Sequence, residues 1–137
     1  MYFRCVLPTR MDRHEELLAQ ERSEALIAAA RTGLGDRLRS VTYFTPSAFQ
    51  QLYLRSDLDP DADLTGFVEL ARDGFRAGRA YAGSELGEYA YTVRVFDEGH
   101  LVRVTGDEEG VFVTAETLTI RRSEEVASAL EGTLAEQ

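Results

Sequence analysis

The sequence predicts an α+β domain, in which a five-stranded antiparallel sheet carries helices on both faces. Three β-rich runs, at 89–96, 100–105 and 111–114, are separated by two turns of hairpin length that are rich in Gly and acidic residues. Both alternating faces of the first run are largely apolar, so we expect the sheet to be covered on each side. With the flanking segments added, the predicted element order is α-β-β-α-β-β-β-α.

The chain has 137 residues, which suits one domain, and its 44% of apolar residues can build an ordinary core. We expect a single domain over residues 12–137. Residues 1–11 are expected to be a disordered leader or a mis-assigned start, because the first ten carry Arg4 and Arg10 but no acidic residue. Met11 then opens an acidic segment of helical composition.

The charge composition is unusual, because all 15 basic residues are Arg and they face 24 Asp and Glu. An acidic composition without Lys is typical of a halophilic cytoplasm, so we expect a cytoplasmic location. The net charge of −9 and the lack of an Arg cluster interleaved with aromatic residues argue against a nucleic-acid partner. No apolar run approaches the ~20 residues that a membrane span needs, so no membrane partner is expected either.

The first helix is expected over residues 12–32, where helix-forming residues dominate and no Pro or Gly interrupts them. Gly33 and Gly35 are expected to end it. Next, the β-branched and aromatic runs 39–45 and 48–54 flank a Pro-Ser turn and predict a hairpin. The second of these runs could instead form a helical turn, since Ala, Gln and Leu favour one.

Four aspartates alternate in the stretch SDLDPDADL, as at the start of a calcium loop. A loop begun at Asp57 would need Gly at its sixth position and Glu at its twelfth, where Ala62 and Val68 stand. The pattern therefore does not predict a calcium site. Asp61 or Asp63 is expected instead to cap the helix that follows.

Two amphipathic helices complete the predicted fold. The central one is expected to lie across the sheet, and its apolar stripe comprises Leu64, Phe67, Val68, Ala71 and Phe75. The C-terminal helix is expected to begin after Ser123, a candidate cap, and to pack back on the sheet. Its apolar stripe comprises Val126, Ala129, Leu130 and Leu134.

No chemical motif points to catalysis. His14 and His100 have no partner at metal-ligand spacing, so both are expected to be solvated surface residues. Cys5 is the single cysteine, and the sequence holds no phosphate-binding loop and no nucleophile elbow. We expect no catalytic residue, no cofactor and no metal site, so the protein is not expected to be an enzyme.

Three polar side chains are candidate ligand-binding residues. Tyr91, Arg94 and Arg103 lie on neighbouring predicted strands, and they could line a pocket between the meander and the central helix. For the two arginines, pairing with carboxylates is a further possibility, and the expected outcome is that each runs its stem along the sheet and keeps its charge in solvent.

The order of elements resembles that of the Roadblock and longin group of small α/β domains, and more loosely that of profilin-like and PAS-like sensor folds. The strings SVTYFT, QLYLRSDL, SELGEYAYTVRVFDEG and GVFVT resemble those of a group of small haloarchaeal proteins that form a domain family of unknown function. This second resemblance covers about residues 24–134. It implies a halophilic cytoplasm and supplies no activity.

Together these observations predict a non-catalytic interaction or regulatory domain of a halophilic cytoplasm. It is expected to act as a homodimer, or with a regulatory protein partner, through an exposed helix or sheet edge. The alternative is a small-molecule-binding sensor domain, which would hold its ligand between the meander and the central helix. An enzyme with a site built from dispersed Asp, Glu and Arg residues is the third possibility.

Overall fold

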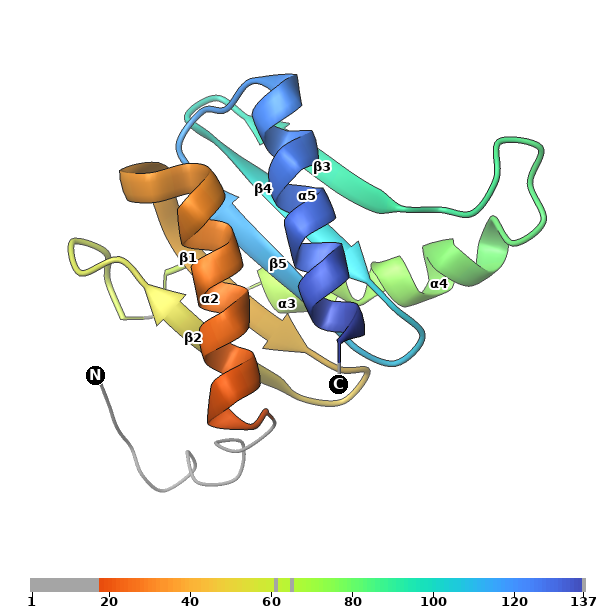
Figure 1. Ribbon diagram of the computed structural model, residues 1–137, viewed down its shortest axis with the longest axis horizontal. Helices are drawn as coiled ribbons and strands as arrows, with labels where there is room; N and C mark the ends of the chain where they lie inside the picture. The colour runs from red at the N-terminus through yellow and green to blue at the C-terminus, as the bar shows by residue number, and fades with distance from the viewer. Residues whose placement is uncertain (1–17, 61, 65, 137) are drawn as a thin grey trace.

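The computed structural model describes residues 18–60, 62–64 and 66–136, and its centre is one five-stranded sheet (Figure 1). All strand pairs are antiparallel and the order is β2-β1-β5-β4-β3, which confirms the predicted fold class. The expected leader 1–11 and the start of the first predicted helix lie outside the described residues. The strands are β1 (Leu38–Phe44), β2 (Phe49–Leu54), β3 (Tyr91–Phe96), β4 (Gly99–Thr105) and β5 (Gly110–Ala115).

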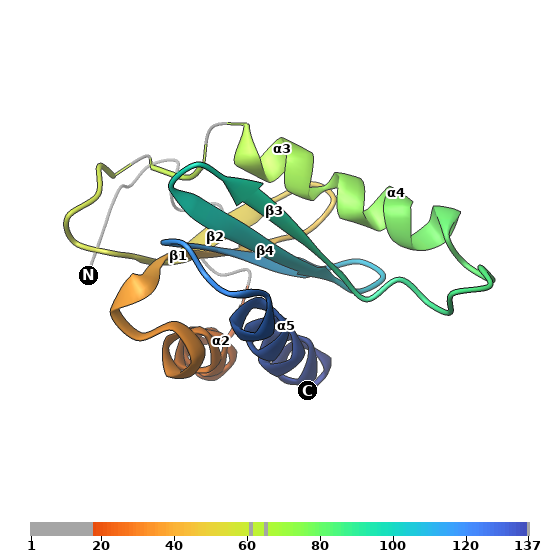
Figure 2. The ribbon, with the colours of Figure 1, turned by 90° about the horizontal axis from the view of Figure 1, so that it is seen from above.

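Helices cover both faces of the sheet, as the sequence predicts. Figure 2 shows α2 and α5 next to each other on one face, with α3 and α4 following one another along the other face. None of the helices in the described ranges is long and apolar enough to cross a membrane. The helices are α2 (Gln20–Leu34), α3 (Phe67–Ala71), α4 (Asp73–Ala80) and α5 (Ile120–Ala135).

The face under α2 and α5 is an aliphatic core. Alternate residues of a strand point to the same face, so Val41 of β1 and Val113 of β5 lie side by side on this one. They pack with Leu26 of α2 and with Val126 and Leu130 of α5, all of them fully buried. Gly35, at φ 57°, follows the last residue of α2 as predicted, because a positive φ does not continue the helix, whereas Gly33 lies inside the helix.

The opposite face carries a smaller, aromatic core. Phe44 of β1 and Phe112 of β5 are fully buried here, and the ring of Phe75 from α4 packs edge-on against Phe44 at a centroid distance of 5.5 Å. Val68 and Ala71 of α3 complete this cluster. The central apolar stripe therefore packs as the sequence predicts, although it belongs to two short helices and not to one.

Several local predictions are wrong. The central helix breaks at Arg72, whose Nε donates to the carbonyl of Thr45 at the end of β1, 2.9 Å away. By contrast, the run 49–54 is the predicted strand of the hairpin, and the alternative of a helical turn is wrong. Ser123 does not cap α5. It lies buried inside the helix, while Thr119 is the cap and its Oγ1 accepts from the Arg122 N–H at 3.1 Å.

Asp63 does not have the expected capping role. Gly66, at φ 80°, is the residue before α3, and no side chain of the described residues caps that helix. Asp63 instead directs its carboxylate to the sheet, and Asp61 lies outside the described residues. An acidic residue before a helix has the local pattern of a cap, but here Asp63 contacts the sheet and not the helix.

Two helix glycines give opposite predictions for replacement by Ala. In Gly74→Ala the new Cβ would lie 2.7 Å from Thr105 Cγ2 and 2.8 Å from Arg103 Nε, inside van der Waals contact. We expect this variant to lose about 1–2 kcal/mol of unfolding free energy, because overpacking outweighs the gain in helix propensity. Gly132→Ala meets no atom within 4 Å and should gain about 0.5–1 kcal/mol.

Urea denaturation of the two variants and the wild type measures both effects. Gly132→Ala is the matched control, because it makes the same change in a helix that has open space beside it. A Gly74→Ala protein as stable as Gly132→Ala would contradict the close packing of α4 against β4.

Candidate functional site

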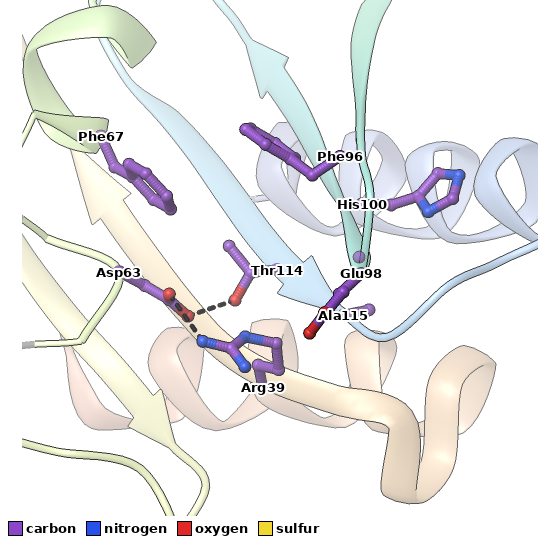
Figure 3. Close-up of a pocket in the computed structure, with 9 residues that line it drawn as sticks. Arg39, Asp63, Phe67, Phe96, Glu98, His100, Thr114 and Ala115 are labelled. Atoms are coloured by element: carbon purple, nitrogen blue, oxygen red, sulfur yellow. Dashed lines mark hydrogen bonds and ion pairs between the residues drawn. The ribbon is translucent and has the colours of Figure 1, made fainter.

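The candidate site is a hollow of about 220 Å³ on the face of the sheet that carries α3 and α4 (Figure 3). Four parts of the chain meet there, namely the start of β1, the end of β5, the turn between β3 and β4, and the segment that leads into α3. Its lining residues are Arg39, Asp63, Phe67, Phe96, Glu98, Gly99, His100, Thr114 and Ala115.

A buried carboxylate holds this region together. The side chain of Asp63 is only 7% exposed, and its Oδ1 accepts from Arg39 Nη2 at 3.0 Å. Its Oδ2 accepts from the hydroxyls of Ser40, at 2.9 Å, and Thr114, at 2.5 Å. Ser40 and Thr114 are register partners on β1 and β5, so the two strands present adjacent hydroxyls to one carboxylate oxygen. We call these four residues the Asp63 cluster.

The surroundings of Asp63 keep it ionised. Burial alone would raise the pKa of its carboxyl group, but the hydrogen bonds from Arg39, Thr114 and Ser40 outweigh burial and lower it below the usual value. A carboxyl group with a lowered pKa is a poor proton acceptor near neutral pH. The cluster is therefore suited to holding structure and charge in place, and unsuited to acid-base catalysis.

Aromatic rings form the apolar wall of the hollow. Phe67 and Phe96 stack at a centroid distance of 6.3 Å with 22° between their planes, and Phe67 also meets Phe112 edge-on at 6.4 Å. Figure 3 shows the Phe67 and Phe96 side chains above the Asp63 carboxylate and the Arg39 guanidinium. The hollow thus combines an aromatic wall with a charged floor.

The structure does not bring the three predicted ligand-binding residues together. Tyr91 packs against the core under α2 and α5, whereas Arg94 and Arg103 point to the opposite face of the sheet. Arg94 is exposed on the edge strand β3, whereas Arg103 on β4 is only 3% exposed. The expectation that Arg103 keeps its charge in solvent is wrong.

Arg103 is instead a buried structural cation. Its Nη1 donates to the Leu70 carbonyl at 3.3 Å, and its Nη2 donates to Tyr89 Oη at 3.0 Å and to Thr92 Oγ1 at 2.9 Å. These bonds tie β4 to α3 and to the chain around β3. Within the described ranges, none of its hydrogen bonds goes to a carboxylate.

A second polar cluster lies at the other end of the molecule. Arg22 of α2 makes a two-pronged contact with Glu109, at 2.9 and 2.8 Å, and Tyr43 Oη donates to the same carboxylate at 2.7 Å. Burial and the bond to Glu109 raise the pKa of Tyr43 to about 12. The Arg22 Nη2 also donates to the carbonyl of Leu134. This cluster fastens the start of α2 to the β4–β5 turn and to the end of α5.

The structure describes one of the two histidines. His100 is partly buried, and its Nδ1 accepts from the backbone N–H of Leu118 at 3.3 Å, so it is less solvated than expected. His14 and Cys5 lie outside the described residues. In the part of the chain that is described, no three His, Cys, Asp or Glu side chains are grouped so as to hold a metal ion.

Sequence reasoning missed Arg39, Phe67, Phe96 and Thr114 as site residues, and it gave Asp63 the wrong role. One signal was present in the sequence, because Ser40 and Thr114 put hydroxyl groups inside strands that are largely buried. A buried hydroxyl needs a partner, so such a pair indicates a polar contact from another part of the chain.

The domain of unknown function DUF7522 matches residues 24–135. This chain belongs to that family. No curated protein sequence matches the chain. The predicted resemblance to a domain family of unknown function is thereby confirmed, while a haloarchaeal origin stays a prediction.

Solved structures confirm the Roadblock-like topology. MglB from Myxococcus xanthus has a TM-score of 0.56 at 12% identity, over 86% of this chain and 93% of that one. The gliding protein MglB from Thermus thermophilus has a TM-score of 0.54 at 14% identity, over 88% and 96%. A Roadblock/LC7 domain from Streptomyces avermitilis has a TM-score of 0.50 at 16% identity, over 78% and 92%. At these identities the likeness shows the fold alone.

The Asp63 cluster predicts a pH-dependent stability that Asp63→Asn removes. Asn tolerates the left-handed backbone at φ 65° as Asp does, but its amide group would face the donors of Arg39, Ser40 and Thr114. We expect the variant to lose about 2–3 kcal/mol of unfolding free energy at pH 7. Because the folded pKa of Asp63 is lowered, acid protonates the unfolded chain first, so the stability difference should shrink as the pH falls below ~4.

Denaturant titrations between pH 7 and pH 3 measure this difference. Asp59→Asn is the matched control, since Asp59 is exposed in the same segment and its side chain makes no hydrogen bond to any described residue. A stability gap between wild type and Asp63→Asn that stayed constant down to pH 3 would rule out the ionised, hydrogen-bonded carboxylate.

Proposed function

We propose that this protein is a non-catalytic interaction domain that forms a homodimer through the open edge of its sheet at β3. The observation that carries the proposal is that this edge strand is apolar and exposed. Among the described strands β3 pairs only with β4, and the second half of β3 is exposed, with Val95 at 72% and Phe96 at 49% exposure. An apolar edge strand is a template for pairing with another chain.

The two edges of the sheet differ in how they are protected. β2, at the far edge, pairs with β1 through an irregular register next to Val41 and Thr42, and such a bulge disfavours pairing with a further strand. β3 pairs with β4 in an unbroken register, and Arg94 is its one charged residue. β3 is therefore the edge that lacks the usual protection.

Apolar side chains flank β3 on both faces of the sheet. Leu70 of α3 is 54% exposed, and its carbonyl accepts from Arg103 on the strand next to β3. Ile120, at the start of α5, is 81% exposed and lines a small groove with Val93 and Val95 of β3. A second copy related by a two-fold axis would cover β3 together with its flanks, since an isologous interface uses the same surface twice.

Two further points support the proposal. A solved structure described as MglB with a tetrameric arrangement has a TM-score of 0.54 at 14% identity, over 88% of this chain, so a protein of this fold does assemble. An apolar edge also suits the halophilic cytoplasm that the composition predicts. At ~1 M salt the Debye length is only ~3 Å, which weakens association between charged surfaces and leaves apolar association available.

Sedimentation equilibrium in multimolar potassium chloride tests the dimer and its location. Val95→Lys puts a charge on the β3 edge, and we expect it to raise the dimer dissociation constant at least about tenfold, because the charge would have to be buried. Ser47→Lys adds the same charge at the exposed turn between β1 and β2 and should leave the constant unchanged. A wild-type protein that stays monomeric at all concentrations would contradict the proposal, as would equal effects of the two variants.

A further inference from the structure

The hollow beside the Asp63 cluster has the size for a small metabolite. Its volume of about 220 Å³ is below the ~300–1,000 Å³ typical of pockets for drug-sized ligands, so a nucleotide or an aromatic cofactor would not fit inside it. It lies between the meander and the segment leading into α3, the region where a sensor ligand is expected from the sequence, although different residues line it.

Arg39 has unused hydrogen-bonding capacity in this hollow. A guanidinium carries five N–H donors, and within the described residues the side chain of Arg39 makes one hydrogen bond, from Nη2 to Asp63. The Arg39 side chain is 30% exposed. Its remaining N–H groups can therefore take a ligand carboxylate, the group whose planar geometry matches a guanidinium best.

Glu98 supplies the opposite charge. It lines the same hollow from the turn between β3 and β4, it is exposed, and its carboxylate has no hydrogen bond or ion pair to any of the described residues. The carboxylate of Asp63 is already bonded to three donors and is almost fully buried, so it is not available to a ligand in the same way. Glu98 is thus the acceptor available to a ligand ammonium group.

The charges also exclude other ligand classes. Arg39, Asp63 and Glu98 together carry a net charge of −1, and one arginine already paired with an aspartate is poorly suited to a phosphate or another dianion. The Phe67 and Phe96 rings supply an apolar wall for a short hydrocarbon chain. A carboxylate, an ammonium group and a small apolar body are the three groups that this lining complements.

We propose that this hollow binds a free amino acid with an aliphatic side chain, of the size of valine or leucine. The carboxylate lies on Arg39, the ammonium group on Glu98, and the side chain against Phe67 and Phe96. Binding at this site would make the protein a sensor of a small zwitterion. The proposal uses residues on one protomer, so it does not depend on the dimer.

Isothermal titration calorimetry with leucine in multimolar potassium chloride tests the site. We expect saturable binding of leucine, and binding at least about tenfold weaker for N-acetylleucine, which lacks the ammonium group, and for leucinamide, which lacks the carboxylate. Glu98→Gln should weaken leucine binding about tenfold without unfolding the protein, because Glu98 lies on an exposed turn. Glu88→Gln is the matched control, since it makes the same change at an exposed residue that does not line the hollow.

Three results would overturn the proposal. They are the absence of leucine and valine binding at tens of millimolar ligand, equal affinity for leucine and its two derivatives, and unchanged affinity in Glu98→Gln. The same titration on Val95→Lys separates this proposal from the proposed function, because loss of the dimer should leave leucine binding in place.

Discussion

The two faces of the sheet are covered by helices of very different length, and this difference determines where the candidate site lies. On one face lie α2 and α5, of 15 and 16 residues, whereas α3 and α4 on the other have only 5 and 8. At 1.5 Å per residue, the second pair has less than half the helical length of the first. The long helices enclose the larger of the two hydrophobic cores. The short ones leave part of the opposite face to a loop, and the Asp63 cluster and the hollow lie there.

The Asp63 cluster shows how a loop can cover a sheet face at low energetic cost. A loop brings polar groups into contact with buried strands, and each of these groups needs a partner. Here Ser40 and Thr114 stand opposite one another on β1 and β5 and meet one carboxylate, while Arg39 balances its charge. Because only Nη2 of Arg39 is used within the described residues, the same contact that closes the fold leaves donors facing the hollow. Structure and proposed binding site thus share one set of residues.

Sequence patterns could predict the elements but not the contacts between them. Period-two alternation predicted the strands, and the apolar stripe from Phe67 to Phe75 predicted which residues of α3 and α4 face the sheet. The break at Arg72 was not predictable, because it accompanies a hydrogen bond to the carbonyl of Thr45, which follows β1 and is distant in sequence. Asp63 had the local pattern of a helix cap, and only the approach of β1 and β5 gives it other partners. Likewise, the buried Arg103 is satisfied by the carbonyl of Leu70 and the hydroxyls of Tyr89 and Thr92. These acceptors are 11 to 33 residues away in the sequence, so the pattern around Arg103 does not reveal them.

The central claim is that β3 is the surface through which this domain associates. Alternate backbone N–H groups of Tyr91–Phe96 point away from β4, and no other described strand pairs with them in a single chain. Hydrogen–deuterium exchange, measured over a range of protein concentrations, reports directly on the protection of these N–H groups. If the domain associates through β3, exchange of these groups slows as the protein concentration rises, while exchange at the far edge strand β2 stays constant. Exchange in β3 that remained equally fast at every concentration would contradict the claim.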